Sequence, residues 1–339
     1  MLDLILEACL ADRPEICATR LLPGPCTEAE AEARARGWAE ARGLSVTAAR
    51  CGRGEALAVE EVAPGVFVHN GAQALADSGN RGDIATIGFV VGEESVAVID
   101  AGGSRAIGEA LYAAVRETTD LPIGWLVITH MHPDHSLGAS VFSEAGAATL
   151  AHAKLPAALE ARTETYLDTL VREAGPEAAL GTEVVLPSET VPERRSLDLG
   201  GRELLLEAHP TAHTDNDLTV FDTATGTLWT GDLVFDGHLP TVDGSVLGWL
   251  DVLEQLAGRE AERAVPGHGG PVLDWPEGAA PTHDYLARLV EETRAAVARG
   301  DSLSDAATTV GQDLAGDWAL FDVFHPRNVT ATFRELEWE

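Results

Sequence analysis

Basic side chains are scarce in this sequence. Lys and Arg number 23 against 55 Asp and Glu, which gives a formal net charge of -32. A field of this sign repels phosphate backbones, so we expect no nucleic-acid partner. The sequence also lacks an uninterrupted apolar run of about 18 residues, so we expect no membrane-spanning helix. With 45% apolar residues over 339 positions, the chain can still bury a substantial core.

Cysteine is confined to the first 51 residues, at Cys9, Cys17, Cys26 and Cys51. The spacings match neither a CxxC redox pair nor a zinc ribbon, and an even, clustered set predicts two disulfides in an oxidising compartment. All three pairings stay open, and four reduced, buried cysteines are the alternative. The start, MLDLILEACLADRPEIC, has acidic residues where a secretory signal would be basic. A periplasmic or secreted location therefore implies that a signal was removed, and a cytoplasmic location is the alternative.

The pattern along the chain divides it near residue 55. Residues 1–55 predict a small helical segment, because LDLILEACL has helical apolar spacing and Thr27 precedes the Ala/Glu/Arg-rich TEAEAEARARGWAEARG. From residue 56 short β runs dominate, first joined by tight turns and later alternating with helical patterns. No long polar linker interrupts residues 56–339. We expect them to form one α/β domain in which two sheets pack face to face with helices outside.

The segment ITHMHPDH, residues 128–135, follows the apolar run WLVI. It places four residues of types that bind metals within six positions, namely His130, His132, Asp134 and His135. A lone histidine is more often a hydrogen-bonded surface residue. Imidazole and carboxylate groups gathered in a loop after a buried strand are instead typical of a zinc-class metal site.

Three further residues of types that bind metals follow other predicted strands. They are His213 in AHTDND, Asp232 in LWTGDLVF and His268 in AVPGHGG. Each alone could be an ordinary turn residue, but their shared position at strand ends makes them candidate ligands.

Four residues are candidates for substrate binding. The segment VFDGHLPTVDGSVLGW contains His238 and Asp243, DSGNRGDI contains Asp83, and His325 is the fourth. A surface position is the alternative for all four.

The ordered set HMHPDH, AHTD, TGD and PGHG, together with VIDAGG, resembles the metallo-β-lactamase-fold superfamily. The resemblance implies a four-layer αβ/βα sandwich with a metal cleft along one edge. It further implies that His130, His132 and His213 hold one ion, that Asp134, His135 and His268 hold a second, and that Asp232 bridges both. Two Zn2+ ions are the default for these nitrogen and oxygen donors, although Fe or Mn accepts similar ligands.

With an aspartate at the bridging position, the sequence resembles the glyoxalase II and general hydrolase branch. Dizinc β-lactamases usually have Cys or Ser near that position. MHPDHSLGA, the cysteine-bearing start and the closing HPRNVTATFRELEWE resemble the bacterial quinoprotein relay system zinc metallohydrolase group. That resemblance implies a zinc-dependent metallohydrolase, but it does not supply the substrate. For a dinuclear site we expect the substrate to be a small-molecule ester, thioester or lactam-like carbonyl. A metal-bridging hydroxide would attack, Asp134 would be catalytic, and an exported quinoprotein dehydrogenase would be a partner.

Two other functions stay open from the sequence. One is a mononuclear iron enzyme similar to persulfide dioxygenases, and the other is a non-catalytic accessory or metal-carrier protein for an exported dehydrogenase. Because His135 and His268 complete a second ligand set, the sequence favours two metals and catalysis.

Overall fold

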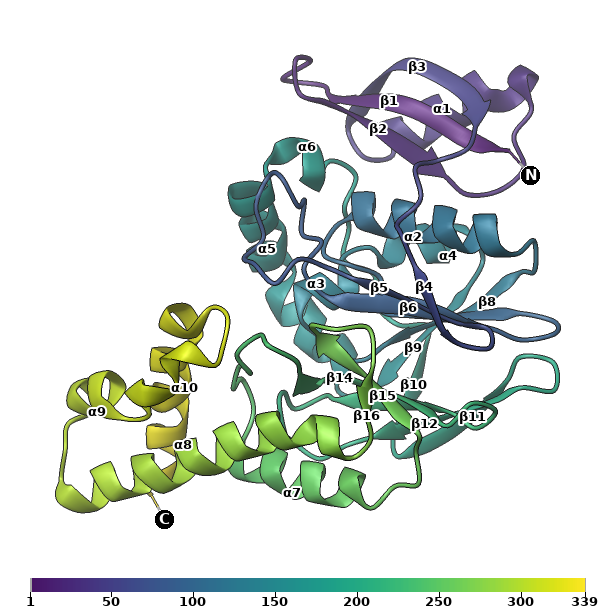
Figure 1. Ribbon diagram of the computed structural model, residues 1–339. Helices are drawn as coiled ribbons and strands as arrows, with labels where there is room; N and C mark the ends of the chain where they lie inside the picture. Colours follow the sequence, from purple (N-terminus) through teal and green to yellow (C-terminus); the bar gives the residue numbers. More distant parts are fainter. Residues whose placement is uncertain (1, 339) are drawn as a thin grey trace.

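Two β-sheets form the middle of the computed structural model, which describes residues 2–338 (Figure 1). The first sheet contains β4 (Glu60–Ala63), β5 (Val66–Asn70), β6 (Thr86–Val91), β7 (Val96–Ile99), β8 (Ile123–Ile128), β9 (Ala148–His152) and β10 (Glu189–Val191). Its seven strands lie in the order β10-β9-β8-β7-β6-β5-β4. The second sheet contains β11 (Arg194–Asp198), β12 (Glu203–Ala208), β13 (Leu218–Asp222), β14 (Thr227–Phe235), β15 (Arg263–His268) and β16 (Leu273–Asp274). Its six strands lie side by side in chain order.

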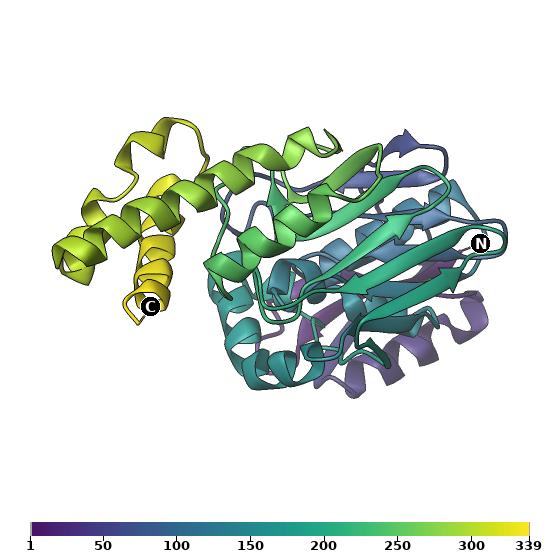
Figure 2. The same cartoon turned by 90° about the horizontal axis from the view of Figure 1, so that it is seen from below.

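Helices cover the outer face of each sheet. The seven-stranded sheet is covered by α2 (Arg105–Thr118), α4 (Ala139–Glu144) and α5 (Leu155–Ala174), with the short α3 (Pro133–Ser136) and α6 (Pro176–Ala179) nearby. The six-stranded sheet is covered by α7 (Val246–Ala257) and the start of α8 (Ala280–Arg299). The rest of α8, α9 (Leu303–Thr309) and α10 (Phe321–Leu336) form an arm that projects beyond the sheets (Figure 2). The predicted four-layer αβ/βα sandwich is confirmed.

The strand β7 shows why this arrangement suits the sequence. Val96 and Val98 pack on the helices of the outer layer, while Ala97 and Ile99 pack against the other sheet. A strand that is buried on both faces is apolar at every position, and β7 pairs in parallel with β8 as such strands often do. This rigid, doubly covered region carries the loop that follows β8.

The N-terminal segment is a small sheet with one helix, so the prediction of a helical segment is wrong for most of it. It contains β1 (Asp3–Leu10), β2 (Cys17–Leu22), α1 (Glu28–Glu40) and β3 (Leu44–Gly52), with the strands in the order β2-β1-β3. Leu4 and Leu6 face α1, while Ile5 faces the main domain. Because both faces of β1 are buried, its apolar residues do not alternate with polar ones, and the run can be mistaken for a helix. Only α1 was predicted correctly.

Both predicted disulfides are present, and the structure supplies their pairing. Cys9 is bonded to Cys17 and joins β1 to β2, while Cys26 is bonded to Cys51 and joins the start of α1 to β3. Among the described residues no cysteine is free. Within the same range, no helix is both long enough and apolar enough to cross a bilayer.

Arg105 at the start of α2 connects the N-terminal segment to the main domain. Its side chain is fully buried, and its Nη2 donates to the carbonyl of Leu21 at 3.0 Å. Its guanidinium also donates to Glu109 and Glu144, each at 2.7 Å, and lies 4.7 Å from the centre of the Trp38 ring. Buried charges that are fully paired in this way impose one docking geometry.

Replacing Arg105 tests the importance of this contact. Arg105→Ala leaves the buried Glu109 without its partner, so we expect the free energy of unfolding to fall by about 3–5 kcal/mol. Arg36→Ala is the control, because its pair with Glu32 is exposed and should contribute less than about 0.5 kcal/mol. Denaturant unfolding of both variants is the measurement. Equal losses in the two variants would contradict the assigned role of Arg105.

Candidate metal centre

The seven predicted ligands meet at one edge of the two sheets. The loop after β8 and the short α3 carry His130, His132, Asp134 and His135. The six-stranded sheet supplies His213 between β12 and β13, Asp232 within β14 and His268 at the end of β15. The potential ligand atoms of His130, His132, His213 and Asp232 lie within 4.8 Å of one another, as do those of Asp134, His135 and His268. The structure therefore brings together all seven side chains that the sequence singled out.

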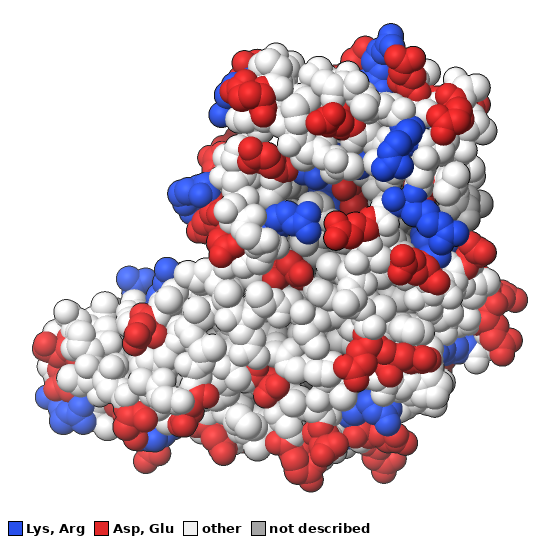
Figure 3. Space-filling view, turned by 45° about the horizontal axis from the view of Figure 1, so that its top comes forward, with Lys and Arg blue, Asp and Glu red and all other residues white. Residues whose placement is uncertain are grey.

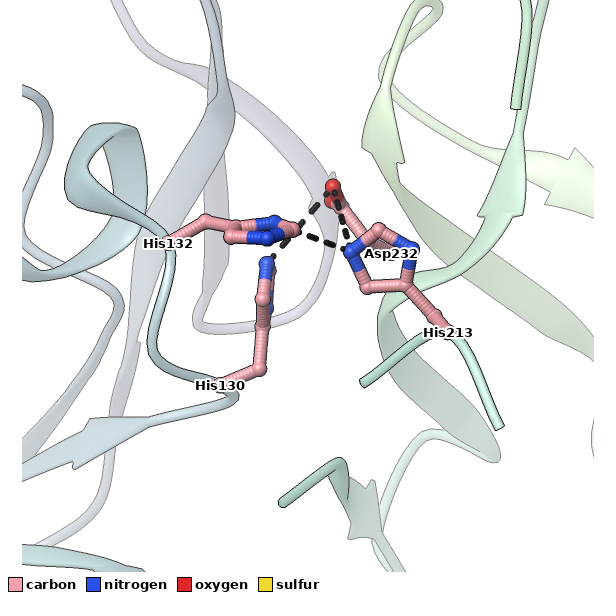
Figure 4. Close-up of side chains that lie close together, drawn as sticks. All are labelled: His130, His132, His213 and Asp232. Atoms are coloured by element: carbon pink, nitrogen blue, oxygen red, sulfur yellow. Dashed lines mark hydrogen bonds and ion pairs between the residues drawn. The ribbon is translucent and has the colours of Figure 1, made fainter. Parts of the chain in front are cut away.

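In the first group, the ring nitrogens of three histidines point toward one another and toward Asp232 (Figure 4). His213 Nε2 lies 3.0 Å from His132 Nδ1 and 3.4 Å from Asp232 Oδ2. The opposite nitrogens have their own acceptors, since His213 Nδ1 donates to Thr241 O at 2.7 Å and His132 Nε2 donates to Asp243 Oδ2 at 3.1 Å. When both rings are neutral, two lone pairs face each other, which is the arrangement that a cation between them would stabilise.

The carboxylate of Asp232, which belongs to the first group, also lies close to two histidines of the second group. Its Oδ1 lies 3.1 Å from His135 Nε2, and its Oδ2 lies 3.4 Å from His268 Nε2. Asp134 Oδ2 lies 3.3 Å from the same nitrogen of His268. Burial lowers the pKa of His268, but the charge of Asp232 and the hydrogen bonds to Asp134 and Asp232 outweigh it and raise the pKa to about 9. The buried carboxylates thus create a strong preference for positive charge.

The residues present fit a metal ion at each group. His130 Nε2, His135 Nε2 and Asp232 Oδ1 are buried and make no well-formed hydrogen bond to the described residues, although His135 Nε2 and Asp232 Oδ1 lie 3.1 Å apart. Buried polar atoms are rarely left unpaired, and three that point into one cluster of nitrogen and oxygen donors are typical of a metal centre. The remaining ring nitrogens are held in place by the protein, as with His268 Nδ1 and the carbonyl of Ile84 at 2.8 Å.

Asp100 supports the centre and was given no role by the sequence analysis. Its carboxylate accepts hydrogen bonds from the Thr129 amide at 2.7 Å, the Thr129 hydroxyl at 2.8 Å and His135 Nδ1 at 2.8 Å. Its φ of 58° is unusual for a residue other than glycine, and such strain often occurs at functional sites. Its position at the end of the apolar run VAVI is the sequence signal that could have identified it.

A cavity of about 590 Å³ opens beside the centre. His132, Asp134, Asp232 and His268 form part of its wall. Of the four candidate substrate-binding residues, His238 and Asp243 also line it, and the other two do not. Asp83 instead pairs with His69 at 2.9 Å. His325 is fully buried in the arm, where it bonds to the Tyr285 hydroxyl at 3.0 Å and the Val310 carbonyl at 2.8 Å.

Several cavity residues come from helices and were not identified from the sequence. They include Tyr166 and Leu170 of α5, and Val323, Phe324, Arg327 and Asn328 of α10. No local motif marks them, because a helix presents isolated residues to a cavity at intervals of three or four positions.

The turn that carries His213 is fixed by His209. The His209 amide donates to the Asp217 carbonyl at 2.9 Å, and His209 Nε2 is hydrogen-bonded to the Thr219 hydroxyl at 2.8 Å. Burial lowers the pKa of His209 to about 4, mainly by removing the charged form from water. In the unfolded chain the pKa is about 6.5. The unfolded state therefore binds more protons below pH 6.5, and the stabilising contribution of neutral His209 is lost as the pH falls toward 4.

His209→Gln should accordingly reduce the pH dependence of stability. Between pH 7.5 and pH 5 we expect the wild-type protein to lose about 2 kcal/mol more free energy of unfolding than the variant. Denaturant unfolding at both pH values measures this difference. Metal release in acid contributes to both proteins and cancels in the comparison. Identical pH dependence in the two proteins would show that His209 is not the titrating group.

Comparisons with known proteins agree with this geometry. The model of the Metallo-beta-lactamase superfamily matches residues 80–268. The acyl-coenzyme A thioesterase MBLAC2 of Bos taurus is 29% identical over 216 residues, which cover 57% of this chain and 74% of that protein. Its Homo sapiens counterpart is 29% identical over 217 residues, with the same coverage.

Solved structures with low sequence identity share the fold. A metallo-beta-lactamase from Pontibacter korlensis has a TM-score of 0.56 and 20% identity, and the match covers 68% of this chain and 99% of that one. The sec-alkylsulfatase Pisa1 from Pseudomonas sp. has a TM-score of 0.64 and 16% identity, over 82% of this chain and 50% of that one. The family match covers more than half of the sequence and includes all seven candidate metal ligands. The chain belongs to the metallo-beta-lactamase superfamily.

Proposed function

We propose that this protein is a dinuclear-metal hydrolase that attacks an ester, thioester or lactam-like carbonyl, with acyl thioesters as the first substrates to test. The observation that carries the proposal is a pair of adjacent groups of possible metal ligands beside a cavity, with Asp232 of the first group also within 3.4 Å of His135 and His268 of the second. The relatives named acyl-coenzyme A thioesterase support the choice of thioesters.

In this proposal His130, His132 and His213 hold one ion, Asp134, His135 and His268 hold the other, and Asp232 contacts both. A pair of divalent cations, with zinc as the default, would polarise the carbonyl and supply a nucleophile from water near neutral pH. The protein fixes the directions of the ligands. Asp100 orients His135 through a 2.8 Å hydrogen bond, and Thr241 orients His213.

Asp134 is the residue of this centre that is best placed to move a proton. Its carboxylate lies at the cavity wall, where a substrate can reach it. Burial raises the pKa of Asp134, but the neighbouring His135 and His268 outweigh that effect and hold the pKa below its ordinary value. The carboxylate is therefore ionised at neutral pH. It can accept the proton of the attacking water and pass it to the leaving thiol or alcohol.

His238 and Asp243 act through histidine ligands in this proposal. Asp243 accepts from His132 Nε2 at 3.1 Å and so fixes the ring orientation of His132. The His238 ring stacks on His268 with centroids 4.8 Å apart, and its Nδ1 donates to Leu239 O at 2.8 Å. Burial lowers the pKa of His238 to about 4, which keeps the ring neutral at the assay pH. Both are positioning residues that also form part of the cavity wall.

The proposal includes an exported location and a quinoprotein dehydrogenase partner. The two disulfides support the location, because such bonds persist in oxidising compartments. The partner rests on the resemblance of the sequence motifs.

Replacement of Asp134 tests the assigned chemistry. Asp134→Asn keeps an oxygen ligand but removes the proton acceptor, so thioester turnover should fall by about 10²- to 10⁴-fold while the metal content stays close to that of wild type. Asp313→Asn is the control, because that exposed carboxylate pairs with Arg288 on the outer arm. Steady-state kinetics and elemental analysis are measured on the same samples. A metal-replete Asp134→Asn protein with full activity would refute the role of Asp134.

The same samples distinguish the proposed hydrolase from the two alternatives, a mononuclear iron dioxygenase and a non-catalytic accessory protein. A hydrolase of this type should contain about two ions per chain. One iron per chain with oxygen-dependent persulfide consumption would identify a dioxygenase. A fully loaded protein that cleaves no ester, thioester or lactam but binds a dehydrogenase subunit would identify an accessory protein.

A further inference from the structure

The C-terminal helix α10 forms part of the cavity although it lies beyond residues 80–268, which match the family model. Val323, Phe324, Arg327 and Asn328 all line the cavity that contains Asp134 and His268. The helix is fixed to the segment that follows β14. Asn328 accepts from the Val242 amide at 2.9 Å and donates to the Pro240 carbonyl at 2.6 Å. Glu335 accepts from the Ser245 hydroxyl at 2.6 Å. Side chains on this helix therefore have a defined place relative to the metal centre.

Arg327 is the only Lys or Arg among the described residues that line this cavity. It is exposed, and within the described chain its side chain makes no ion pair or hydrogen bond, as is also true of Arg334 on the same helix. The Arg327 guanidinium lies 5.7 Å from the ring centre of Phe324, another cavity residue. In a chain with 55 acidic and 23 basic side chains, an arginine without a carboxylate partner at a cavity wall is available to a ligand.

The rest of the cavity limits the kind of ligand that Arg327 can bind. Apolar side chains form much of the wall, among them Leu75, Leu137, Leu170, Phe235, Val242 and Val323. The carboxylates that line the cavity include those of Glu173 and Asp243, in addition to Asp134 of the metal centre. Acidic side chains are also spread widely over the molecular face in Figure 3. Glu173, Asp243 and the formal net charge of -32 disfavour a polyphosphate group, whereas one carboxylate can be paired by one guanidinium.

We propose that Arg327 binds a carboxylate of the substrate, so that the preferred substrate is a short, largely apolar ester or thioester with a single carboxylate group. This inference rests on the proposed hydrolase function. A planar guanidinium can hold a carboxylate with two parallel hydrogen bonds, which fixes the position of the reacting carbonyl as well as contributing affinity. Arg327 is then a specificity-determining residue that the arm adds to the site.

Three thioesters of similar size provide the test. Pentanoyl N-acetylcysteamine is neutral, the glutaryl monothioester of N-acetylcysteamine has its carboxylate on the acyl side, and the pentanoyl thioester of 3-mercaptopropionate has it on the leaving group. Arg327→Gln should raise KM by about 10- to 100-fold for one of the two anionic thioesters, the expected cost of losing a charge-assisted hydrogen bond. We expect little change in kcat and none for the neutral thioester. The affected substrate identifies the side on which the carboxylate lies.

Arg334→Gln is the matched control, because it removes the same charge from the same helix at a position that does not line the cavity. It should leave all three KM values unchanged. Equal effects of Arg327→Gln on neutral and anionic thioesters, no effect on either, or the same effect from Arg334→Gln would overturn the inference.

A binding measurement separates this inference from the proposed function. Calorimetry with the non-hydrolysable thioether analogues of the three substrates should show at least about tenfold weaker binding of one anionic analogue to Arg327→Gln, and unchanged binding of the neutral analogue. If the wild-type protein hydrolyses no ester, thioester or lactam, the proposed function fails, and the thioether affinities still decide the role of Arg327. Equal affinities of wild type and Arg327→Gln for every analogue would refute it.

Discussion

The buried carboxylate of Asp232 lies between 3.1 and 3.6 Å from ring nitrogens of four histidines, His130, His135, His213 and His268. A buried charge is tolerated only when it is paired and its oxygens have partners. Here the partners come from both sheets. Both sheets and the loops that carry these histidines must therefore be folded and packed together before Asp232 is paired. The cation pair proposed above would satisfy the carboxylate and the inward-facing ring nitrogens together, whereas protons would satisfy only some of them.

The sheets around Asp232 hold the candidate metal ligands in place, whereas part of the cavity wall comes from elements outside the two sheets. The doubly buried β7 and the buried β14 hold the ligand-bearing segments, and Asp100 ties the loop after β8 to β7. The N-terminal sheet packs against α2, which covers the outer face of the seven-stranded sheet, and Arg105 of α2 donates to the Leu21 carbonyl of β2. The arm adds α10 to the cavity from outside the matched family segment. The reaction centre thus belongs to the superfamily fold, while the proposed substrate preference belongs to the arm of this chain.

The sequence predicted the ligand cluster because its information is local. Four of the seven side chains stand within six positions, and His213 follows a strand as the sequence predicts. Asp232 and His268 were expected just after strands, but Asp232 lies within β14 and His268 is the last residue of β15. The sequence analysis failed where a residue's structure or role depends on contacts with residues far away in the chain. The strand β1 looked helical because the main domain, far along the chain, covers its second face. Arg327 was missed because only the packing of α10 against residues 240–246 brings it to the cavity.

The most direct test of a shared metal pair is anomalous X-ray diffraction from crystals of the metal-loaded protein. The account predicts two peaks about 3.5–4 Å apart, with Asp232 between them and three further ligands from this set at each. A single peak held by only one of the two groups, or metal bound elsewhere while the seven side chains keep their present contacts, would contradict it.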